Sequence, residues 1–427
     1  MRQCRQWART ILFLLVFALL FFAANPLFIP QEELRREKAA FYQQPANTLD
    51  VVYIGSSSMV RAVSPMEIWY HYGIPSYSLA TTLQAPVVTL AFLEDMFKTQ
   101  QPQVVVFGFE WLFQDYDYAG REAYLRFALD PMPNSWTKLK TAAAIVRNDP
   151  SQSLLSYLFP MLRYHTRWSE LDTYSLPDDT QSVQMGYLGL GQSRCWPMPQ
   201  SHMASTGVEP SFSEESLYYY RQAIALCQAR GVEVLLVKFP RLLWSAEEAQ
   251  AQQAFADEMG IPLLDFNQPE YWEALSLDHT RDFYDTGHLS ASAASRLSRF
   301  LGAYLQEHYD LTDKRSQGEY AAWNEAAPEY FRRFACSIHA DYREWDAVYQ
   351  VELSSDYLEL YDLQPEDFTY HWTLYRDGTA IEEVADTASN QFSPALSGPG
   401  TYAATCQVFQ NGVLLDTLSS LEKQYTQ

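Results

Sequence analysis

Hydrophobic and polar positions divide the chain into three parts with different periodicities. Residues 11–24 form an unbroken apolar run near the N-terminus. Between residues 50 and 310, short apolar runs alternate with longer segments whose apolar positions recur at helical spacing. Beyond residue 335, short segments alternate apolar with polar residues, as half-exposed strands do. The pattern predicts an apolar N-terminal helix, a central α/β domain and a C-terminal β domain.

Five short apolar segments predict the strands of one parallel sheet. They span residues 51–54, 76–79, 104–107, 232–237 and 262–266. Helical segments lie between them, and right-handed crossovers then imply a three-layer αβα sandwich with a flavodoxin-like five-stranded parallel sheet. Two of the helices carry start signals, because Ser64 with Glu67 and Ser245 with Glu248 have the spacing of a capping box. Ligands of such sheets bind at the carboxyl ends of the strands.

The N-terminal apolar run is about long enough to cross a bilayer when residues 27–29 are added to it. Arg2, Arg5 and Arg9 precede the run, and mixed charge follows it. This asymmetry predicts a single-pass anchor with the N-terminus in the cytoplasm and the bulk of the chain outside the cell membrane. A cleaved signal peptide is the alternative, because Ala23 and Ala24 are small.

Changes in pattern set the domain limits that we expect. They are a cytoplasmic N-terminus with a transmembrane anchor at 1–30, a juxtamembrane linker at 31–47, the α/β domain at 48–312, a linker at 313–335 and a β-sandwich at 336–427. Residues 112–210 interrupt the α/β domain with an insertion rich in aromatic residues. Aromatic faces stack on sugar rings, so two interpretations stay open: a glycan-binding lid, or a segment that packs its aromatics on the sandwich.

The C-terminal segment resembles an immunoglobulin-like sandwich. Trp372 suits the core tryptophan of that fold and Tyr402 its tyrosine corner. Ala404 stands where the usual second cysteine follows the tyrosine, so the resemblance implies no intersheet disulfide. Such a domain binds a glycan or a partner protein, or serves as a spacer or dimer contact.

Charge and cysteine usage narrow the range of partners. The formal net charge of −22 disfavours nucleic acid as a partner. The five cysteines show no paired metal-ligand spacing, and we expect neither a metal nor a cofactor. Outside the cell, two of Cys195, Cys336 and Cys406 can form a disulfide, but the sequence does not select the pair.

Two short motifs supply the groups of nucleophilic catalysis. Ser57 follows the first predicted strand, and Asp285 stands three residues before His288. Serine is a poor nucleophile unless a base accepts its proton, and a histidine held by a carboxylate is a suitable base. The alternative is that Ser57 and its neighbours only cap a helix and that the other two are ordinary loop residues.

The same motifs resemble the SGNH/GDSL hydrolase superfamily over residues 48–310. Gly55-Ser56-Ser57 after the first strand and Asp285-Thr286-Gly287-His288 before the last helix carry the resemblance. The Gly-Ser-Ser motif is followed by an arginine, Arg61, four residues after Ser57. This arrangement is similar to that of membrane-anchored envelope members of the superfamily, such as the D-alanine-transfer protein and polysaccharide O-acetyltransferases. The resemblance implies Ser57 as nucleophile, His288 as general base and Asp285 as its orienting group.

Two positions depart from the superfamily pattern, and both concern the oxyanion hole. Ala80 stands where a glycine usually supplies one donor, and Glu110 stands where an asparagine supplies another. The backbone N–H groups of Ser57 and Ala80 are the expected oxyanion donors. Four charged residues are candidates for binding an anionic substrate or positioning it: Arg61, Glu110, Lys238 and Arg241. The alternative is a surface salt bridge for each cation and a structural or solvated carboxylate for Glu110.

The sequence therefore favours a membrane-anchored serine esterase or O-acyltransferase acting on an envelope or exported glycan. A membrane-bound acyl-donor protein is an expected partner. Two alternatives stay open: a catalytically weak glycan-binding scaffold, and a metal-dependent esterase. The metal alternative rests on a group of five residues, Asp278, His279, Asp282, Asp285 and His288.

Overall fold

A five-stranded sheet lies at the centre of the molecule, and all of its strands are parallel. The computed structural model describes residues 2–171 and 182–426. The strands are β1 (Val51–Ile54), β2 (Ser76–Ser78), β3 (Val104–Gly108), β5 (Glu233–Lys238) and β6 (Leu263–Asp265). Their order, β2-β1-β3-β5-β6, is that of a doubly wound sheet. The predicted parallel five-stranded sheet is thereby confirmed.

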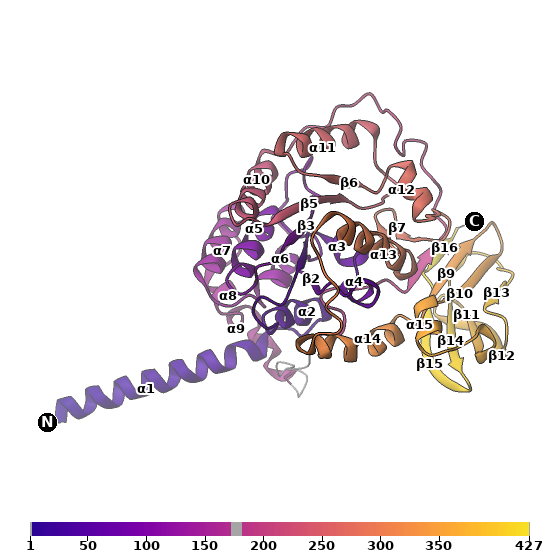
Figure 1. Cartoon of the computed structure of the whole chain (residues 1–427). Coiled ribbons are helices and arrows are strands. Elements are labelled where there is room, and N and C mark those ends of the chain that lie inside the picture. The colour runs from indigo at the N-terminus through magenta and orange to yellow at the C-terminus, as the bar shows by residue number, and fades with distance from the viewer. Residues whose placement is uncertain (1, 172–181, 427) are drawn as a thin grey trace.

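Helices cover both faces of this sheet (Figure 1). Alternate residues of β1 enter two separate cores: Val52 and Ile54 belong to one, Val51 and Tyr53 to the other. The first core is covered by α5 (Pro86–Met96), α10 (Glu214–Gln228) and α11 (Ala246–Met259), and the second by α3 (Ser57–Ala62) and α13 (Ala291–His308). Burial on both faces explains why the central strands are uninterrupted apolar runs.

The two predicted capping boxes have different outcomes. Ser245 and Glu248 close a full box at the start of α11. Ser64 accepts a hydrogen bond from the Glu67 N–H at the start of α4 (Pro65–Tyr72), but the Glu67 carboxylate does not return it. That carboxylate instead lies 3.6 Å from His71 Nε2, one turn further along the same helix.

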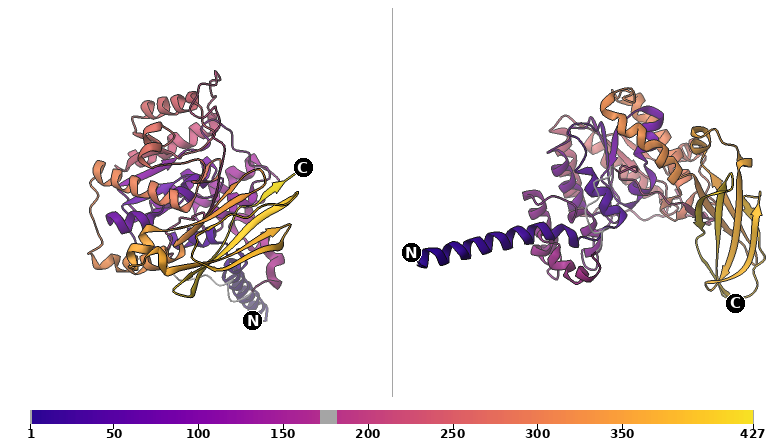
Figure 2. Two further views of the ribbon diagram at one scale, coloured as in Figure 1. Left: turned by 90° about the vertical axis from the view of Figure 1, so that its right-hand side faces the viewer. Right: turned by 90° about the horizontal axis from the view of Figure 1, so that it is seen from below.

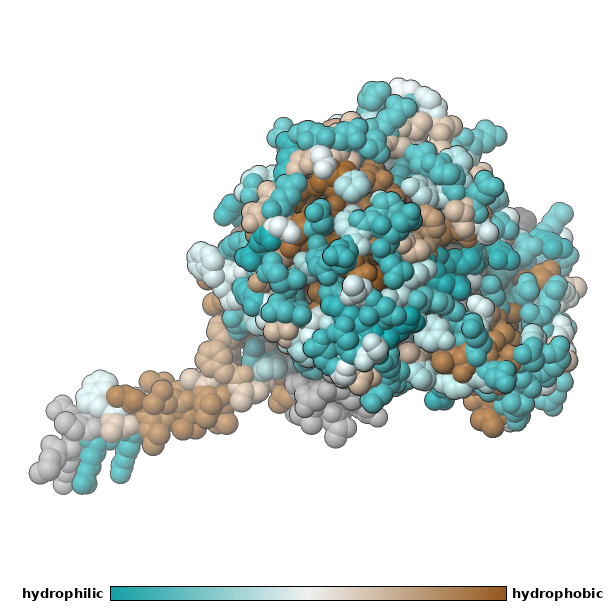
Figure 3. Space-filling model, viewed as in Figure 1, coloured by the Kyte–Doolittle hydropathy of each residue, from teal (hydrophilic) through white to brown (hydrophobic). Residues whose placement is uncertain are grey.

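The N-terminal helix α1 (Arg2–Ala24) projects away from the rest of the chain, and its surface is apolar beyond its first few turns (Figures 1, 2 and 3). It is long and apolar enough to be a membrane anchor or a signal sequence. The chain continues through η1 (Asn25–Phe28) into α2 (Glu33–Phe41). The ammonium of Lys38 on α2 is fully buried and donates to the carbonyl of Ser78 at the end of β2. Burial lowers the pKa of Lys38 to about 7.

The insertion is mainly helical. It contains α6 (Glu122–Leu129), α7 (Trp136–Asn148), α8 (Leu154–Leu158), α9 (Met161–Tyr164), η2 (His165–Ser169) and β4 (Gln192–Arg194). Residues 172–181 of the insertion lie outside the described residues. Tyr116, Tyr118 and Tyr157 are buried in the first core, whereas Trp136 and Trp168 are exposed. The aromatic residues of the insertion therefore divide between core packing and surface.

The C-terminal part forms two mainly antiparallel sheets, as the period-two pattern predicted. One is β13-β10-β9-β4 and the other is β12-β11-β14-β15, with β16 on β14. Their strands are β9 (Cys336–Tyr342), β10 (Ala347–Leu353), β11 (Phe368–Arg376), β12 (Thr379–Thr387), β13 (Gln391–Phe392), β14 (Gly400–Gln410), β15 (Val413–Ser419) and β16 (Lys423–Tyr425). Trp372 is fully buried, and the Tyr402 hydroxyl donates to the carbonyl of Ser397 at 2.9 Å.

The second predicted linker and the insertion contain regular secondary structure. Helix α14 (Ala321–Arg333) occupies most of the second predicted linker, and β4 from the insertion pairs in parallel with β9. Cys195, Cys336 and Cys406 are free thiols, so none of the disulfides left open by the sequence is formed.

A buried ionic network joins α4 to α15 (Ser355–Leu360) of the C-terminal part. His71 Nε2 lies 3.2 Å from Asp356 Oδ1 and 3.6 Å from Glu67 Oε2. Arg299 Nη1 from α13 lies 3.7 Å from the same Asp356 oxygen. Burial opposes protonation of His71, but the two carboxylates outweigh it and raise its pKa to about 9. Because Arg299 already supplies a cation to this group, we interpret it as an ion-pair network and not as a metal centre.

Candidate active site

Ser57 lies at the carboxyl end of β1, as predicted, and is the first residue of the short helix α3. The turn before it needs a glycine for reasons of space. A Cβ atom on Gly55 would lie 3.2 Å from both the Cα and the carbonyl oxygen of Gly108, at the end of β3. The two glycines therefore let β1 and β3 approach each other at the point where the strand order reverses. Ser57 is half-buried beside this point.

Asp285 and His288 belong to a two-stranded hairpin between α12 (Pro269–Ala274) and α13. Strand β7 (Phe283–Asp285) pairs antiparallel with β8 (His288–Leu289), and Asp285 stands directly opposite His288. Residues that are opposite each other in such a pair present their side chains to the same face. The spacing Asp-x-x-His thus follows from a hairpin with a two-residue turn. The N–H of Gly287 in that turn donates to Asp285 Oδ1 at 2.8 Å.

The three side chains form a continuous hydrogen-bonded chain. His288 Nε2 lies 2.8 Å from Ser57 Oγ, and His288 Nδ1 lies 2.8 Å from Asp285 Oδ2. Burial alone would raise the pKa of the Asp285 carboxyl, but the hydrogen bond and charge of His288 and the backbone N–H groups of the turn hold it below its usual range. An ionised Asp285 keeps the proton of the neutral imidazole on Nδ1, which leaves Nε2 to accept the proton of Ser57.

The predicted oxyanion donors lie at the ends of neighbouring strands. Ser57 opens α3, so its N–H has no partner within the helix. Ala80 follows β2, where the N–H of Leu79 continues the strand ladder by donating to the Tyr53 carbonyl at 2.8 Å. Within the described residues, neither the Ser57 N–H nor the Ala80 N–H donates a hydrogen bond to the protein. Both are therefore available to an oxyanion.

Glu110 is directed toward two cations, Lys238 at the end of β5 and Arg241 in the segment that follows it. Its Oε2 lies 3.4 Å from Lys238 Nζ and 3.8 Å from Arg241 Nη1. Burial opposes ionisation of Glu110, but Lys238, Arg241 and the hydroxyl of Ser58 hold its pKa below the usual range. Burial lowers the pKa of Lys238, whose ammonium also lies 4.1 Å from the centre of the Trp244 ring. The structure thus brings three of the four predicted substrate-binding residues together.

A cavity of about 640 Å³ lies beside this charged group. Glu110, Arg241 and Trp244 line it, together with Thr206 and Val208 from the end of the insertion. Arg61, the fourth candidate, has a different environment, because its guanidinium donates to the Leu188 carbonyl at 2.6 Å. Arg61 therefore holds the segment after the insertion helices against α3.

The five residues of the metal alternative do not converge on one point. Asp278 accepts from Thr280, and His279 Nδ1 lies 2.6 Å from the Trp196 carbonyl. Asp282 pairs with Arg296 at 2.7 Å. Each of these side chains has a local partner, while Asp285 and His288 belong to the chain that includes Ser57.

Two tryptophans brace the site without a sequence signal that marks them. Trp244 lies under the Lys238 ammonium. Trp196 donates from Nε1 to the Tyr284 carbonyl at 3.3 Å, and the Arg194 guanidinium lies 3.8 Å from its ring centre. The hydrogen bond of Trp196 joins segments 88 residues apart, so periodicity and spacing could not reveal it.

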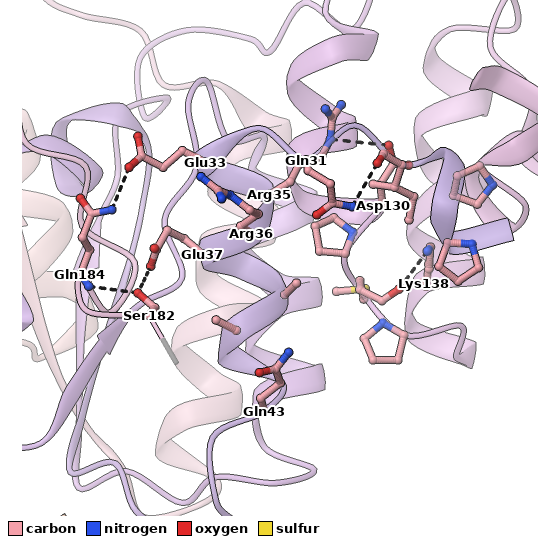
Figure 4. A pocket seen from close by; sticks show the side chains of 18 of the residues that line it. Gln31, Glu33, Arg35, Arg36, Glu37, Gln43, Asp130, Lys138, Ser182 and Gln184 are labelled. Carbon is pink, nitrogen blue, oxygen red and sulfur yellow. Dashed lines mark hydrogen bonds and ion pairs between the residues drawn. The ribbon is translucent and has the colours of Figure 1, made fainter. Parts of the chain in front are cut away.

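A second cavity, of about 630 Å³, lies at the base of α1 and away from the serine (Figure 4). Residues of η1, α2 and the turn before α7 line it, and many of its charged groups have protein partners. Glu37 accepts from Ser182 and from the Gly186 N–H, and Glu33 pairs with Arg333. Burial raises the pKa of Asp130 although Arg126 and Tyr164 hydrogen-bond to it.

The chain has structural neighbours among known proteins but no sequence relative in the two sequence comparisons. No protein-family model matches the sequence, and no curated protein matches it. Among solved structures, the chain is similar to a Bacteroides fragilis protein assigned as an acylhydrolase, with 9% identity over 65% of this chain and 99% of that one, at a TM-score of 0.32. It is also similar to a gut microbial diltiazem-metabolizing enzyme, with 12% identity over 80% and 71% of the two chains, at a TM-score of 0.24. TM-scores this low carry no argument about activity.

Proposed function

We propose that this chain is an SGNH-type serine esterase or O-acyltransferase, anchored in the cell membrane and facing outward. One observation carries the proposal: Ser57 Oγ, His288 Nε2, His288 Nδ1 and Asp285 Oδ2 form one chain with 2.8 Å at both hydrogen bonds. Nucleophile, base and orienting carboxylate come from opposite ends of the α/β domain, 231 residues apart at the serine–histidine contact. Their convergence at the carboxyl edge of a parallel sheet supports a catalytic role.

The geometry supports a two-step acyl transfer. Ser57 Oγ attacks the carbonyl carbon of an acyl ester while His288 Nε2 takes the serine proton. Collapse of the tetrahedral intermediate breaks the ester C–O bond, and His288 returns the proton to the departing alcohol. Water or a sugar hydroxyl then attacks the acyl-Ser57 ester, with His288 again removing and returning one proton. Hydrolysis and transfer differ only in this second acceptor.

The mechanism also requires hydrogen-bond donors that stabilise the negative charge on the oxygen of the tetrahedral intermediate. The N–H groups of Ser57 and Ala80 are the donors we assign to it, and the positive end of α3 adds to the first. Glu110 cannot donate a hydrogen bond while it is ionised. Loss of one oxyanion donor typically lowers turnover by about a hundredfold or more, so we expect a slow enzyme.

We infer that the substrate is an acylated glycan of the envelope or an exported polymer. Arg241 is partly exposed at the wall of the cavity beside the site, where it can meet an anionic sugar or polymer phosphate. The antiparallel C-terminal domain, whose Trp372 and Tyr402 support an immunoglobulin-like sandwich, is a candidate surface for the polymer. An acyl-donor protein in the same membrane is the partner that transfer requires.

A fluorophosphonate probe on the full-length chain in detergent tests the proposal. We expect labelling of the wild type and none of Ser57→Ala. The matched control is Ser153→Ala, an exposed serine at the start of α8 whose side chain makes no capping bond, and it should label like the wild type. A folded wild type that never labels would favour the glycan-binding scaffold. Esterase activity that survives in Ser57→Ala but disappears with a chelator would select the metal-dependent alternative.

A further inference from the structure

Large apolar side chains are exposed on the helices of the insertion. Trp136 is 74% exposed, Trp168 72%, Leu155 58% and Leu162 47%. They come from the start of α7, from α8 and α9, and from η2. We call these four residues the foot surface. Exposed apolar side chains that gather on neighbouring elements are typical of a surface that contacts a partner or lipid, because apolar area left in water is unfavourable.

The foot surface is fixed to the point where α1 leaves the body of the chain. The ring of Phe159, between α8 and α9, lies 5.4 Å from that of Phe21 and 5.6 Å from that of Phe22, both on α1. The N–H of Met161 donates to the side chain of Asn25 at 3.0 Å. Figure 1 shows α8 and α9 beside the base of α1, with α7 beyond them and in contact with α8.

A second hydrogen bond fixes the other side of this junction. The guanidinium of Arg167 on η2 donates to the Phe28 carbonyl at 2.8 Å. The helices of the foot surface are therefore held at the end of the apolar helix by ring contacts and by two hydrogen bonds. If α1 crosses a bilayer, they lie at its surface.

The composition of the foot surface fits the interfacial layer of a bilayer. Tryptophan is enriched at that level because its ring is apolar and its N–H is polar. Arg163, which is half exposed and pairs with Glu122, stands beside the apolar residues, and an arginine stem can extend along apolar surface while the guanidinium stays at headgroup level. The cavity at the base of α1 is lined by Pro26, Ile29 and Leu158 from the same elements, so it would open at headgroup level (Figure 4).

We propose that the foot surface inserts into the outer interfacial layer of the same bilayer that α1 spans. The partner is a lipid surface, and the contact sets the orientation of the α/β domain relative to the membrane. This inference rests on the anchoring part of the proposed function. It adds a second, peripheral contact that α1 alone does not supply, and it assigns the exposed aromatics of the insertion to lipid and not to glycan.

Tryptophan quenching by brominated phospholipids tests the proposal on the full-length chain in phosphatidylethanolamine–phosphatidylglycerol nanodiscs. The fluorescence of each tryptophan is obtained as the difference between the spectra of the wild type and of the Trp→Phe variant. It is measured in lipids that carry bromine either near the headgroup or deep in the acyl chain. We expect the signal removed by Trp136→Phe and by Trp168→Phe to be quenched by the shallow bromine at least twofold more than by the deep one.

Two further tryptophans make the outcomes distinguishable. Trp7, 67% exposed on α1, reports whether the anchor is in the bilayer, and Trp345, 45% exposed on the C-terminal domain, is the control that should not be quenched. Quenching of Trp7 without quenching of Trp136 and Trp168 would overturn the foot surface and leave the anchor intact. Absence of quenching at Trp7 would overturn the anchor itself. Quenching of Trp345 to the same extent would show that the contact is not confined to the foot surface, and would contradict the proposal.

Discussion

At the scale of single residues, the geometry of the site depends on the hydrogen bonds of Asp285 and on the small size of Gly55. The Asp285 carboxylate accepts from His288 and from the N–H of Gly287, so it stays ionised and fixes the orientation of the ring that lies between it and the serine. Gly55 has a different role, because its lack of a side chain lets β1 and β3 meet. We therefore expect a substitution of Asp285 to lower activity and a substitution of Gly55 to lower stability.

The substitution Asp285→Asn tests the orienting role. The amide side chain of this variant would present either an N–H or a neutral carbonyl to His288 Nδ1, and the imidazole would lose its fixed tautomer. We expect kcat for an activated ester to fall by about 10³–10⁴, with little change in KM or in the unfolding free energy. Steady-state kinetics and urea unfolding measure both. A loss below about tenfold would contradict the role.

Replacing Gly55 with alanine tests the close approach of the two strands. The new methyl group would meet backbone atoms of Gly108, which cannot move away as a side chain can. We expect a loss of about 1–3 kcal/mol in stability and a slower reaction of Ser57 with the fluorophosphonate. Gly318→Ala is the control, because nothing lies within 4 Å of its added Cβ. Equal stability of the two variants would contradict the packing argument.

At the scale of elements, the ends of β3 and β5 decide what surrounds the serine. Glu110 follows β3, and Lys238 ends β5, so the neighbouring strands place a carboxylate and an ammonium in contact. Both are almost fully buried, which makes each charge costly without the other. The pair can therefore be structural, with Arg241 as the group that meets substrate.

Removing one or both members of this pair separates the two roles. Glu110→Gln leaves the Lys238 ammonium buried and unpaired, and we expect a loss of about 3–5 kcal/mol in unfolding free energy by urea titration. The double variant Glu110→Gln with Lys238→Met should recover most of that loss. Its KM for an anionic acylated glycan should stay within about threefold of the wild type while Arg241→Gln raises KM more. A double variant as unstable as the single one would contradict the pairing.

Sequence patterns predicted the elements whose signals are local. The five strands of the sheet follow from short apolar runs, and the pairing of Asp285 with His288 follows from a spacing that a tight hairpin satisfies. The Ser245 box also formed as predicted, whereas Glu67 of the other box turned to His71 because Asp356 and Arg299 complete a network there. That choice depends on residues from α13 and from the C-terminal part of the chain, so local spacing could not decide it.

Long-range contacts also account for the other differences. Arg61 donates one hydrogen bond to the Leu188 carbonyl of the insertion, a contact that the sequence did not predict, and its role toward substrate stays a prediction. The segment at 31–47 reads as a polar linker, yet α2 within it buries Lys38 against the end of β2. Both depend on tertiary partners that composition does not reveal. The domain limits and the catalytic roles stay predictions.

At the scale of the whole molecule, the α/β domain is tied to the C-terminal domain by charges and by a shared sheet. Strand β4 of the insertion adds to the sheet of β9, and α4 meets α15 through His71. In the network, His71 faces Glu67 and Asp356, and Arg299 approaches Asp356 from α13. The position of the C-terminal domain is thus sensitive to the charge on one imidazole.

This network predicts a pH dependence of stability. The pKa of His71 is raised from 6.5 to about 9 in the folded chain, so its contribution is fully present below the unfolded value and is lost as pH rises through about 9. We expect the difference in unfolding free energy between wild type and His71→Gln to shrink by roughly 1–3 kcal/mol from about pH 6 to about pH 10. Urea titrations at both ends measure it. A difference that is constant or grows with pH would contradict the assignment.

The proposed mechanism requires a covalent acyl-Ser57 intermediate, which rapid-quench mass spectrometry can detect. The full-length chain is mixed with an activated short-chain ester, quenched in acid and digested. The mass of the peptide that contains Ser57 is then measured. We predict one acyl mass on Ser57, formed at the rate of ester turnover in the wild type and far more slowly in Asp285→Asn. Ester turnover without acyl on Ser57, or with acyl on another residue at the same rate, would contradict the mechanism.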